Sequence, residues 1–297
     1  MLFFQYLRRN VPLAVGLTIL LFLIIFSSVG LFYINPKKDP YPLAAPARVA
    51  PTLAYCPKTE PACADPKAYI FGTDAQGRDL FAIAVMGTWL TIRIGVLAGV
   101  IGMLVGMVVG FTSAYYGGLY DYIVRWLVDV LLTVPGLLVL VVIASSLGAE
   151  TITVDQMALI ISLLAWMGPA RVIRSQVLSM RERPYVMMAR LNGMSDLGII
   201  FRELIPNLLP YLGASLVGSV TGAIFASIGL AALGLGTLRE PLLGVTIFWA
   251  QQQSAMLSGM WWWYAVPISI IVLIFVMLFM ISAGLDELAN PRVRRAV

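Results

Sequence analysis

The chain has 297 residues, of which 60% are hydrophobic and only 12% are charged. An average soluble domain carries about 25% charged residues, so this composition excludes an ordinary water-soluble fold. With no His and only two Cys, the chain lacks imidazole bases, imidazole metal ligands and a thiolate metal site. It also lacks a GxxxxGK[ST] phosphate loop, and no Lys follows residue 67. We therefore expect no catalytic residue, no bound metal and no nucleotide hydrolysis by this chain.

The net charge of +5 does not indicate nucleic-acid binding. The Arg residues flank apolar stretches and form no basic stripe, which is typical of charges that orient a protein in a bilayer. We expect contact with membrane lipid and no nucleic-acid partner.

Long charge-free intervals predict an all-α membrane protein with six transmembrane helices. A bilayer core about 30 Å thick requires about 20 apolar residues in a helix. The first three intervals lie between residues 9 and 37, 93 and 121, and 129 and 150. The fourth, between residues 155 and 171, is short. We expect Arg171 and Arg174 to snorkel to the headgroups and to extend this span to about residue 177.

The last two spans follow a polar loop. The fifth helix is predicted to begin after Pro210 and to end before residue 238. The polar stretch QQQS at residues 251–254 divides the next interval into a short interfacial helix at 243–256 and a sixth span at 262–284. Residues 261–264, which read WWWY, are expected to form an aromatic belt at the membrane surface.

The distribution of cations predicts that both termini are cytoplasmic. The first apolar segment is longer than the h-region of a signal peptide and is followed by no A-x-A site, so we expect an uncleaved helix. An inside N-terminus places 12 of the 20 Lys and Arg residues in cytoplasmic segments. The predicted divisions are an N-terminal tail and first helix (1–36), an extracytoplasmic loop (37–86), a transmembrane core (87–286) with a cytoplasmic loop (180–204), and a cytoplasmic tail (287–297).

The predicted extracytoplasmic loop contains both cysteines, Cys56 and Cys63. An oxidising compartment would permit a disulfide between them. The alternative is two unpaired thiols.

The segment from Arg181 to Pro210 is predicted to form two short helices joined by an elbow. Pro184 suits a first helical turn, Gly193 can adopt the left-handed conformation that ends a helix, and Ser195 can cap the next helix beside Asp196. Apolar side chains on the first of these helices are expected to be exposed and to contact a partner; they are Tyr185, Val186, Met187, Met188 and Leu191. The alternative is an interfacial helix on lipid headgroups, and the pattern alone favours neither.

This segment resembles the cytoplasmic loop of binding-protein-dependent ABC importer permeases, in the second-permease type of the dipeptide, oligopeptide and nickel branch. Residues in register with the pattern YVEAARALGASDxxIIFRHILPNxLP are Tyr185, Val186, Ala189, Arg190, Gly193, Ser195, Asp196, Ile199, Ile200, Phe201, Arg202, Ile205, Pro206, Asn207 and Pro210. Met187 and Met188 replace the usual Glu and Ala, and Asn192 replaces a Leu. The resemblance implies a type I ABC importer permease fold.

The same resemblance implies that the elbow couples the permease to an ATPase subunit. The implied coupling residues are Tyr185, Val186, Met187, Met188, Ala189, Arg190, Asn192, Gly193, Ser195 and Asp196. Because the Glu is missing, we expect docking to depend on apolar packing, for which flexible methionine side chains are suited.

Other stretches resemble the same branch, and together they extend over about residues 70–295. FGTDAQGRDL at residues 71–80 is similar to its GTDxxGRD signature, formed here by Gly72, Thr73, Asp74, Gly77, Arg78 and Asp79. Further similarity lies at residues 115–138, 233–236 and 284–294. The glycines suit turns and Thr73 or Asp74 suits a helix cap, so structure alone can explain the signature. The alternative is contact with a solute-binding protein.

Two rows of small residues lie in predicted membrane helices. Gly102, Gly106 and Gly110 form one row, and Gly218 and Gly222 precede Ala226 in the other. Packing against neighbouring helices is the expected explanation for both. The alternative is a translocation path in the fifth helix, for which the candidate lining residues are Ser215, Ser219, Thr221 and Ser227. Ser227 stands where the branch often has an acidic residue.

The resemblance implies a multi-pass subunit of an ATP-driven importer in the bacterial cytoplasmic (inner) membrane. Its implied partners are a homologous second permease, two ATP-binding subunits that hold ATP and Mg, and an extracytoplasmic solute-binding protein. The expected substrates are di- or oligopeptides, with oligosaccharides or another small solute as alternatives. A stand-alone secondary transporter would show an internal repeat or charges within the membrane, and neither is evident.

Overall fold

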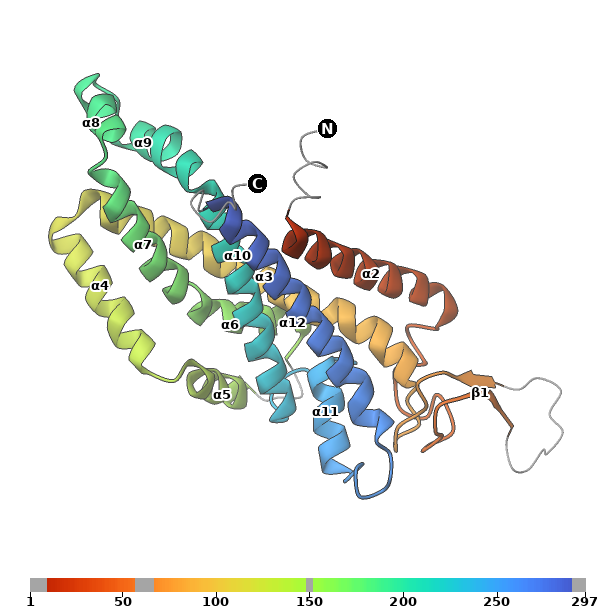
Figure 1. Ribbon diagram of the computed structural model, residues 1–297. Coiled ribbons are helices and arrows are strands. Elements are labelled where there is room, and N and C mark those ends of the chain that lie inside the picture. Colours follow the sequence, from red (N-terminus) through yellow and green to blue (C-terminus); the bar gives the residue numbers. More distant parts are fainter. Residues whose placement is uncertain (1–9, 57–66, 148–151, 290–297) are drawn as a thin grey trace.

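The computed structural model describes residues 10–56, 67–147 and 152–289 of the chain. The predicted helical membrane architecture is confirmed: elongated helices form a bundle, and a small β-hairpin projects from one end of it (Figure 1). The helices are α2 (Val11–Tyr33), α3 (Leu80–Tyr116), α4 (Gly118–Thr133), α5 (Gly136–Leu147), α6 (Val154–Ala165), α7 (Met167–Arg181), α8 (Pro184–Leu191), α9 (Asp196–Ile199), α10 (Ile205–Ala232), α11 (Leu243–Gln252) and α12 (Trp262–Ala289). The antiparallel strands are β1 (Thr52–Tyr55) and β2 (Lys67–Tyr69).

Membrane-spanning length is reached in two ways. Within the described residues, four helices are long and apolar enough to cross a bilayer alone. Two further pairs reach that length together but are bent, α4 with α5 by 79° and α6 with α7 by 40°. The six predicted spans are obtained when each bent pair counts as one. Pro135 explains the sharper bend, because a residue that precedes proline is restricted to extended backbone and Val134 is extended.

The first helix is fastened to the last. Asn10 caps α2 by accepting the N–H of Leu13 (3.0 Å), and its side-chain amide donates to the carbonyl of Gly284 in α12 (2.9 Å). A Cβ atom placed on Gly284 would lie 2.5 Å from the Cβ of Leu13, so the two backbones pack in close contact. Figure 1 shows α2 running from this junction toward the hairpin end of the bundle.

Helix α3 is the longest element and is central to the bundle. Its 37 residues span about 55 Å at 1.5 Å per residue. It begins at Leu80, inside the segment predicted as an extracytoplasmic loop up to residue 86, and it continues through Arg93. Because Arg93 is charged, the predicted span began only after it. In the structure the helix passes through Arg93, whose guanidinium pairs with the carboxylate of Asp155 in α6 at 2.8 Å. The sequence did not show this pairing.

The glycine row of α3 packs against α6 and α7, as predicted. A Cβ atom on Gly102 would lie 2.6 Å from the Cβ of Ala165, and one on Gly106 would lie 2.6 Å from the carbonyl oxygen of Trp166. One on Gly110 would lie 2.9 Å from the carbonyl oxygen of Ala170. Real Cβ atoms do not approach backbone atoms so closely, so this helix contact requires glycine.

The predicted start of the fifth helix is wrong. Helical structure is continuous from Asp196 to Ala232, with Pro206 in the first turn of α10 and Pro210 inside it. A π-turn, η1 (Ile200–Leu204), precedes the first proline and changes the hydrogen-bonding register there. Both prolines therefore lie within the helix, and neither marks the end of the preceding loop.

The predicted aromatic belt is only partly formed. Trp261 is 61% exposed, whereas Trp262 and Trp263 are buried. The indole of Trp262 donates to the carbonyl of Thr73 (3.2 Å), and Trp263 packs with Leu80 and Ile83 at the start of α3. Consecutive helical residues point about 100° apart, so one stretch of tryptophans cannot face the lipid together.

We expect Gly106→Ala to destabilise the bundle by about 1–3 kcal/mol, because the added methyl meets backbone and not a flexible side chain. Gly213→Ala in α10 is the matched control: the nearest heavy atom to its Cβ position, the Cδ1 of Leu285, lies at an ordinary contact distance of 3.7 Å, so the change should be neutral or stabilising by up to about 1 kcal/mol. Thermal unfolding of both purified variants in detergent measures the difference. Equal stability of the two variants would contradict the glycine contact.

Candidate functional site: a surface elbow and an apolar groove

The elbow lies at the end of the bundle opposite the hairpin, where α8 and α9 extend beyond the other helices (Figure 1). Its predicted local structure is confirmed. Pro184 occupies the first turn of α8, and Gly193 has a φ of 78°. The hydroxyl oxygen of Ser195 accepts the N–H of Gly198 (3.2 Å) and so caps α9, which begins at Asp196.

One face of α8 is apolar and exposed. Met187 is 57% exposed, Met188 59% and Leu191 77%. Val186 was predicted to share this face, and that prediction is wrong, because its side chain is buried with Ala189 in a cluster that joins α7, α9 and α10. Residues 186 and 189 are three apart and share the inner face of the helix. The side chains of Met187, Met188 and Leu191 thus form a small exposed apolar surface, while the opposite face of α8 packs against the bundle.

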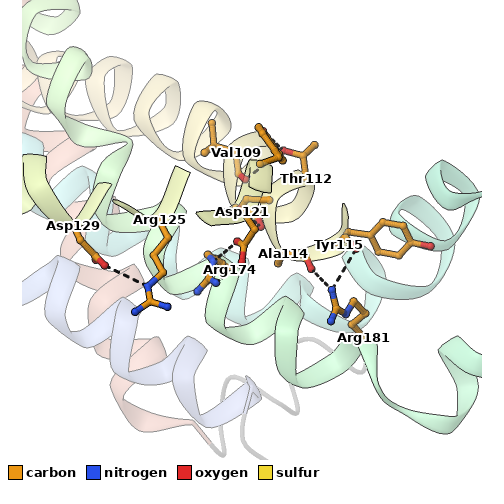
Figure 2. A network of polar contacts seen from close by, with 12 residues as sticks. Val109, Thr112, Ala114, Tyr115, Asp121, Arg125, Asp129, Arg174 and Arg181 are labelled. Atoms are coloured by element: carbon orange, nitrogen blue, oxygen red, sulfur yellow. Dashed lines mark hydrogen bonds and ion pairs between the residues drawn. The ribbon is translucent and has the colours of Figure 1, made fainter. Parts of the chain in front are cut away.

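Polar contacts attach the elbow to the end of α3. The hydroxyl of Tyr115 donates to the Asp196 carboxylate (2.7 Å), and the Arg190 guanidinium lies 5.8 Å from the centre of the Tyr115 ring. Arg181, at the end of α7, donates to the carbonyl of Ala114 (2.9 Å), as Figure 2 shows. Ala114 and Tyr115 lie in the last turn of α3, where carbonyl groups lack partners within the helix. Sequence reasoning missed Tyr115, since nothing local indicates a partner 81 residues away.

A second set of charges joins α4 to α7 (Figure 2). Arg174 donates two hydrogen bonds to the Asp121 carboxylate, each 2.6 Å long. Both side chains are largely removed from solvent, and a bidentate pair of this kind is strong and geometrically specific. Arg174 was predicted to snorkel to lipid headgroups; the structure shows its guanidinium paired with Asp121, and its depth in the bilayer stays a prediction. The side chain of Arg171, in contrast, is exposed, and its Nε lies 3.8 Å from a carboxylate oxygen of Asp129.

At the opposite end, the GTDxxGRD signature forms a buried loop. Thr73, Asp74 and Arg78 are buried, and Asp74 pairs with Arg78 while accepting the N–H groups of Gln76 and Arg78 (both 2.8 Å). The hydroxyl of Thr73 accepts the N–H of Val49 (2.9 Å). Gly72 and Gly77 have positive φ, as turns require.

The helix cap in this loop is Asp79, which accepts the N–H of Phe81 (2.9 Å). The prediction that Thr73 or Asp74 would cap a helix is wrong, because both belong to the preceding turn. Cys56 follows β1 and is disulfide-bonded. Cys63 lies outside the described residues, so the pairing of these two cysteines stays a prediction.

An apolar groove of about 560 Å³ lies among α5, α6, α7 and α10. Three of its lining glycines, Gly168, Gly218 and Gly222, have no heavy atom within 4 Å of their Cβ positions in the described structure. The prediction that the α10 glycines pack against neighbouring helices is therefore wrong within this chain. They leave one side of α10 open.

The predicted path residues divide between the groove and the core. Ser215 and Ser219 line the groove, and the hydroxyl of Ser219 donates to the carbonyl of Gly99 (3.1 Å). Ser227 is buried, and the hydroxyl of Thr221 donates back to the carbonyl of Val217 (2.7 Å). The groove lining contains no charged side chain. Among the described residues there is also no cluster of carboxylate or thiol groups that could hold a metal ion.

Comparison with known proteins identifies the family. Residues 102–295 match the family described as binding-protein-dependent transport system inner membrane component. The chain belongs to this family. It is 29% identical to the dipeptide transport system permease protein DppC of Bacillus subtilis, over 97% of this chain and 84% of that protein. It is 32% identical to the oligopeptide transport system permease protein OppC of Mycobacterium tuberculosis, over 75% of this chain and 76% of that protein.

The fold of this permease resembles a solved structure from the same class of transporter. A chain of the MetNI methionine ABC transporter, in an inward-facing conformation, has a TM-score of 0.54 and 18% identity. The likeness covers 71% of this permease and 97% of that chain. The protein is a multi-pass permease subunit of an ABC importer in the inner membrane, and such an importer works with ATPase and substrate-binding partners.

The partly buried cap of α3, Asp79, predicts a pH-dependent stability. Burial, assisted by nearby Asp39, raises the pKa of the Asp79 carboxyl from 3.8 to about 6, against the opposing effect of the Phe81 and Ala82 N–H groups. The folded state therefore holds this proton more tightly than the unfolded chain, and the contribution of Asp79 to stability is lost as the pH rises from about 4 through about 6. Asp79→Asn keeps a capping oxygen but does not titrate.

We expect wild type to lose on the order of 1–3 kcal/mol more than Asp79→Asn between pH 4 and pH 7. Thermal unfolding of the two proteins across this range measures the difference. Parallel stability curves would show that Asp79 titrates normally.

Proposed function

We propose that this permease forms half of the translocation pathway of an ATP-driven importer of di- or oligopeptides. The observation that carries the proposal is the elbow, an apolar projection packed onto the ends of α3 and α7, in a chain that also presents an open groove. Peptides are favoured because the relatives DppC and OppC are named as dipeptide and oligopeptide permeases, and a Brucella abortus relative at 31% identity is named a putative peptide permease. Oligosaccharides or another small solute remain the alternative.

The other half of the pathway is a homologous second permease. The groove supports this assignment, because Gly168, Gly218 and Gly222 leave backbone uncovered that a facing chain could approach closely. Its apolar lining, interrupted by the hydroxyls of Ser215 and Ser219, suits a path that is closed by helix contact and opened by helix movement. Two ATP-binding subunits hold ATP and Mg, and this chain carries no catalytic step.

The elbow docks on an ATPase subunit through Met187, Met188 and Leu191. With Met187 in place of the usual Glu, apolar contact replaces a salt bridge at this position. ATP binding closes the two ATPases, the elbow moves with them, and the bundle switches between inward-facing and outward-facing states. This is a two-state element whose equilibrium is biased from a distant site.

The extracytoplasmic end receives the solute-binding protein. Asp74 and Arg78 are buried and hold the loop in shape, so any contact falls to exposed residues around them. With both termini and the elbow cytoplasmic, this end faces outward, in agreement with the disulfide at Cys56, which requires an oxidising compartment.

We expect Tyr115→Phe to uncouple ATP hydrolysis from uptake. The change removes the hydroxyl that binds Asp196 and keeps the ring beside Arg190, at a cost of about 1–2 kcal/mol in the link between elbow and α3. Solute imported per ATP hydrolysed by the reconstituted transporter should fall several-fold. Tyr116→Phe is the matched control, since Tyr116 is exposed and its ring packs edge to face with that of Tyr115, an arrangement that phenylalanine keeps. Equal stoichiometry in both variants would refute the link.

Gly193→Val should also uncouple the transporter. A β-branched residue cannot adopt a φ of 78° without strain, so the elbow would change shape, whereas Gly193→Asn should be tolerated. No heavy atom lies within 4 Å of the Cβ position at residue 193, so a loss of coupling in Gly193→Val would arise from backbone strain and not from a clash at Cβ. The measurement is again uptake per ATP, and normal coupling in Gly193→Val would count against the proposed role of the elbow.

The peptide assignment is tested by uptake of labelled di- and oligopeptides into proteoliposomes that contain the complete importer. Uptake of labelled oligosaccharides, with no peptide uptake, would overturn the substrate class while leaving the coupling mechanism intact.

A further inference from the structure

We propose that the pocket between α4 and α7 binds the phosphate of an anionic phospholipid headgroup. The pocket has a volume of about 230 Å³ and is lined by Arg125, Arg171, Arg174, Asp129 and Ser175, among others. Figure 2 labels three of its lining residues, Arg125, Asp129 and Arg174, and the pocket shares no lining residue with the groove.

Three arginines line the pocket, and two carboxylates, those of Asp121 and Asp129, pair with them. Asp121 neutralises Arg174 through two hydrogen bonds of 2.6 Å. A single carboxylate, that of Asp129, is left for the other two guanidiniums, at 3.6 Å from Arg125 and 3.8 Å from Arg171. These separations exceed a normal charge-assisted hydrogen bond of about 2.7–2.9 Å. One positive charge is therefore in excess, and the donors of two guanidiniums stay available to an anion.

Exposure shows that these donors can be reached. The side chains of Arg125 and Arg171 are 64% and 65% exposed, and they come from different helices on either side of the pocket. A guanidinium offers a planar fork of N–H groups that matches two phosphate oxygens, and two such forks can hold one phosphodiester.

The surroundings of the pocket indicate membrane depth. On α4, Tyr122 and Trp126 are exposed on either side of Arg125, and Leu127 and Val130 are exposed further along the helix. Tyr and Trp gather where headgroups meet hydrocarbon, and basic pockets between helices at that depth suit anionic headgroups. The apolar surface of α4 then lies where the acyl chains of such a lipid would run. This favours a lipid over a free phosphate.

The test uses the assembled transporter, stripped of lipid and titrated with phosphatidylglycerol, phosphatidylcholine or inorganic phosphate under native mass spectrometry. We expect phosphatidylglycerol to bind wild type preferentially. Arg125→Gln and Arg171→Gln should each weaken that binding about tenfold, the loss of one charged contact. Arg202→Gln, at an exposed arginine in η1 outside the pocket, is the control and should bind as wild type.

A second kind of variant should strengthen lipid binding. Asp129→Asn removes the competing carboxylate, so phosphatidylglycerol should bind several-fold more tightly. This result does not depend on the arginine variants keeping their fold. Equal binding of phosphatidylglycerol and phosphatidylcholine, or no gain in Asp129→Asn, would overturn the proposal. Saturation by inorganic phosphate alone would assign the pocket to a free anion and would overturn the lipid assignment.

Discussion

The close contact of α3 with α6 and α7 is the constraint on which the rest of the bundle depends. Gly102, Gly106 and Gly110 allow the backbones to meet without side chains between them. Because α7 leads directly into the elbow, this contact sets where the elbow begins. The Arg181 bond to Ala114 and the Tyr115 bond to Asp196 then fasten both sides of the elbow to the end of α3. A displacement of the elbow must therefore move α3 and α7 together.

Small residues serve two purposes in this chain, and the sequence pattern is the same for both. On α3 the glycines are covered by α6 and α7, whereas on α10 they line an open groove. The difference is that no helix of the described structure covers the glycines of α10. Under the proposed function, a second permease would cover them.

Local signals predicted the elbow well, because its shape depends on residues that act within one or two turns. Pro184, Gly193 and Ser195 each impose a backbone conformation wherever they occur. Hydropathy likewise predicted the spans, but it could not show that Pro135 bends one of them. Burial within a helix was harder: Val186 and Trp263 lie on inner faces that only the packing of neighbouring elements defines.

Long-range polar pairs could not be predicted from the sequence. Arg174 and Asp121 are 53 residues apart, and Arg93 and Asp155 are 62 apart, so each charge looked like a residue at a membrane boundary. The groove depends on four helices, so the small residues and serines of α10 marked one of its walls and the sequence did not show the other three. The ten residues from Phe71 to Leu80 are an intermediate case, since the turns were evident and the buried pairing of Asp74 with Arg78 was not.

The bond between Asn10 and Gly284 has a consequence for the order of assembly. It joins residues 274 apart, so during synthesis α2 enters the bilayer long before its partner α12 exists. Until then α2 must remain in the lipid without that contact, which fits its being the least buried of the four long helices. The hydrogen bond between Asn10 and Gly284 can form only after α12 has been inserted, so insertion of α12 is the event that completes the bundle.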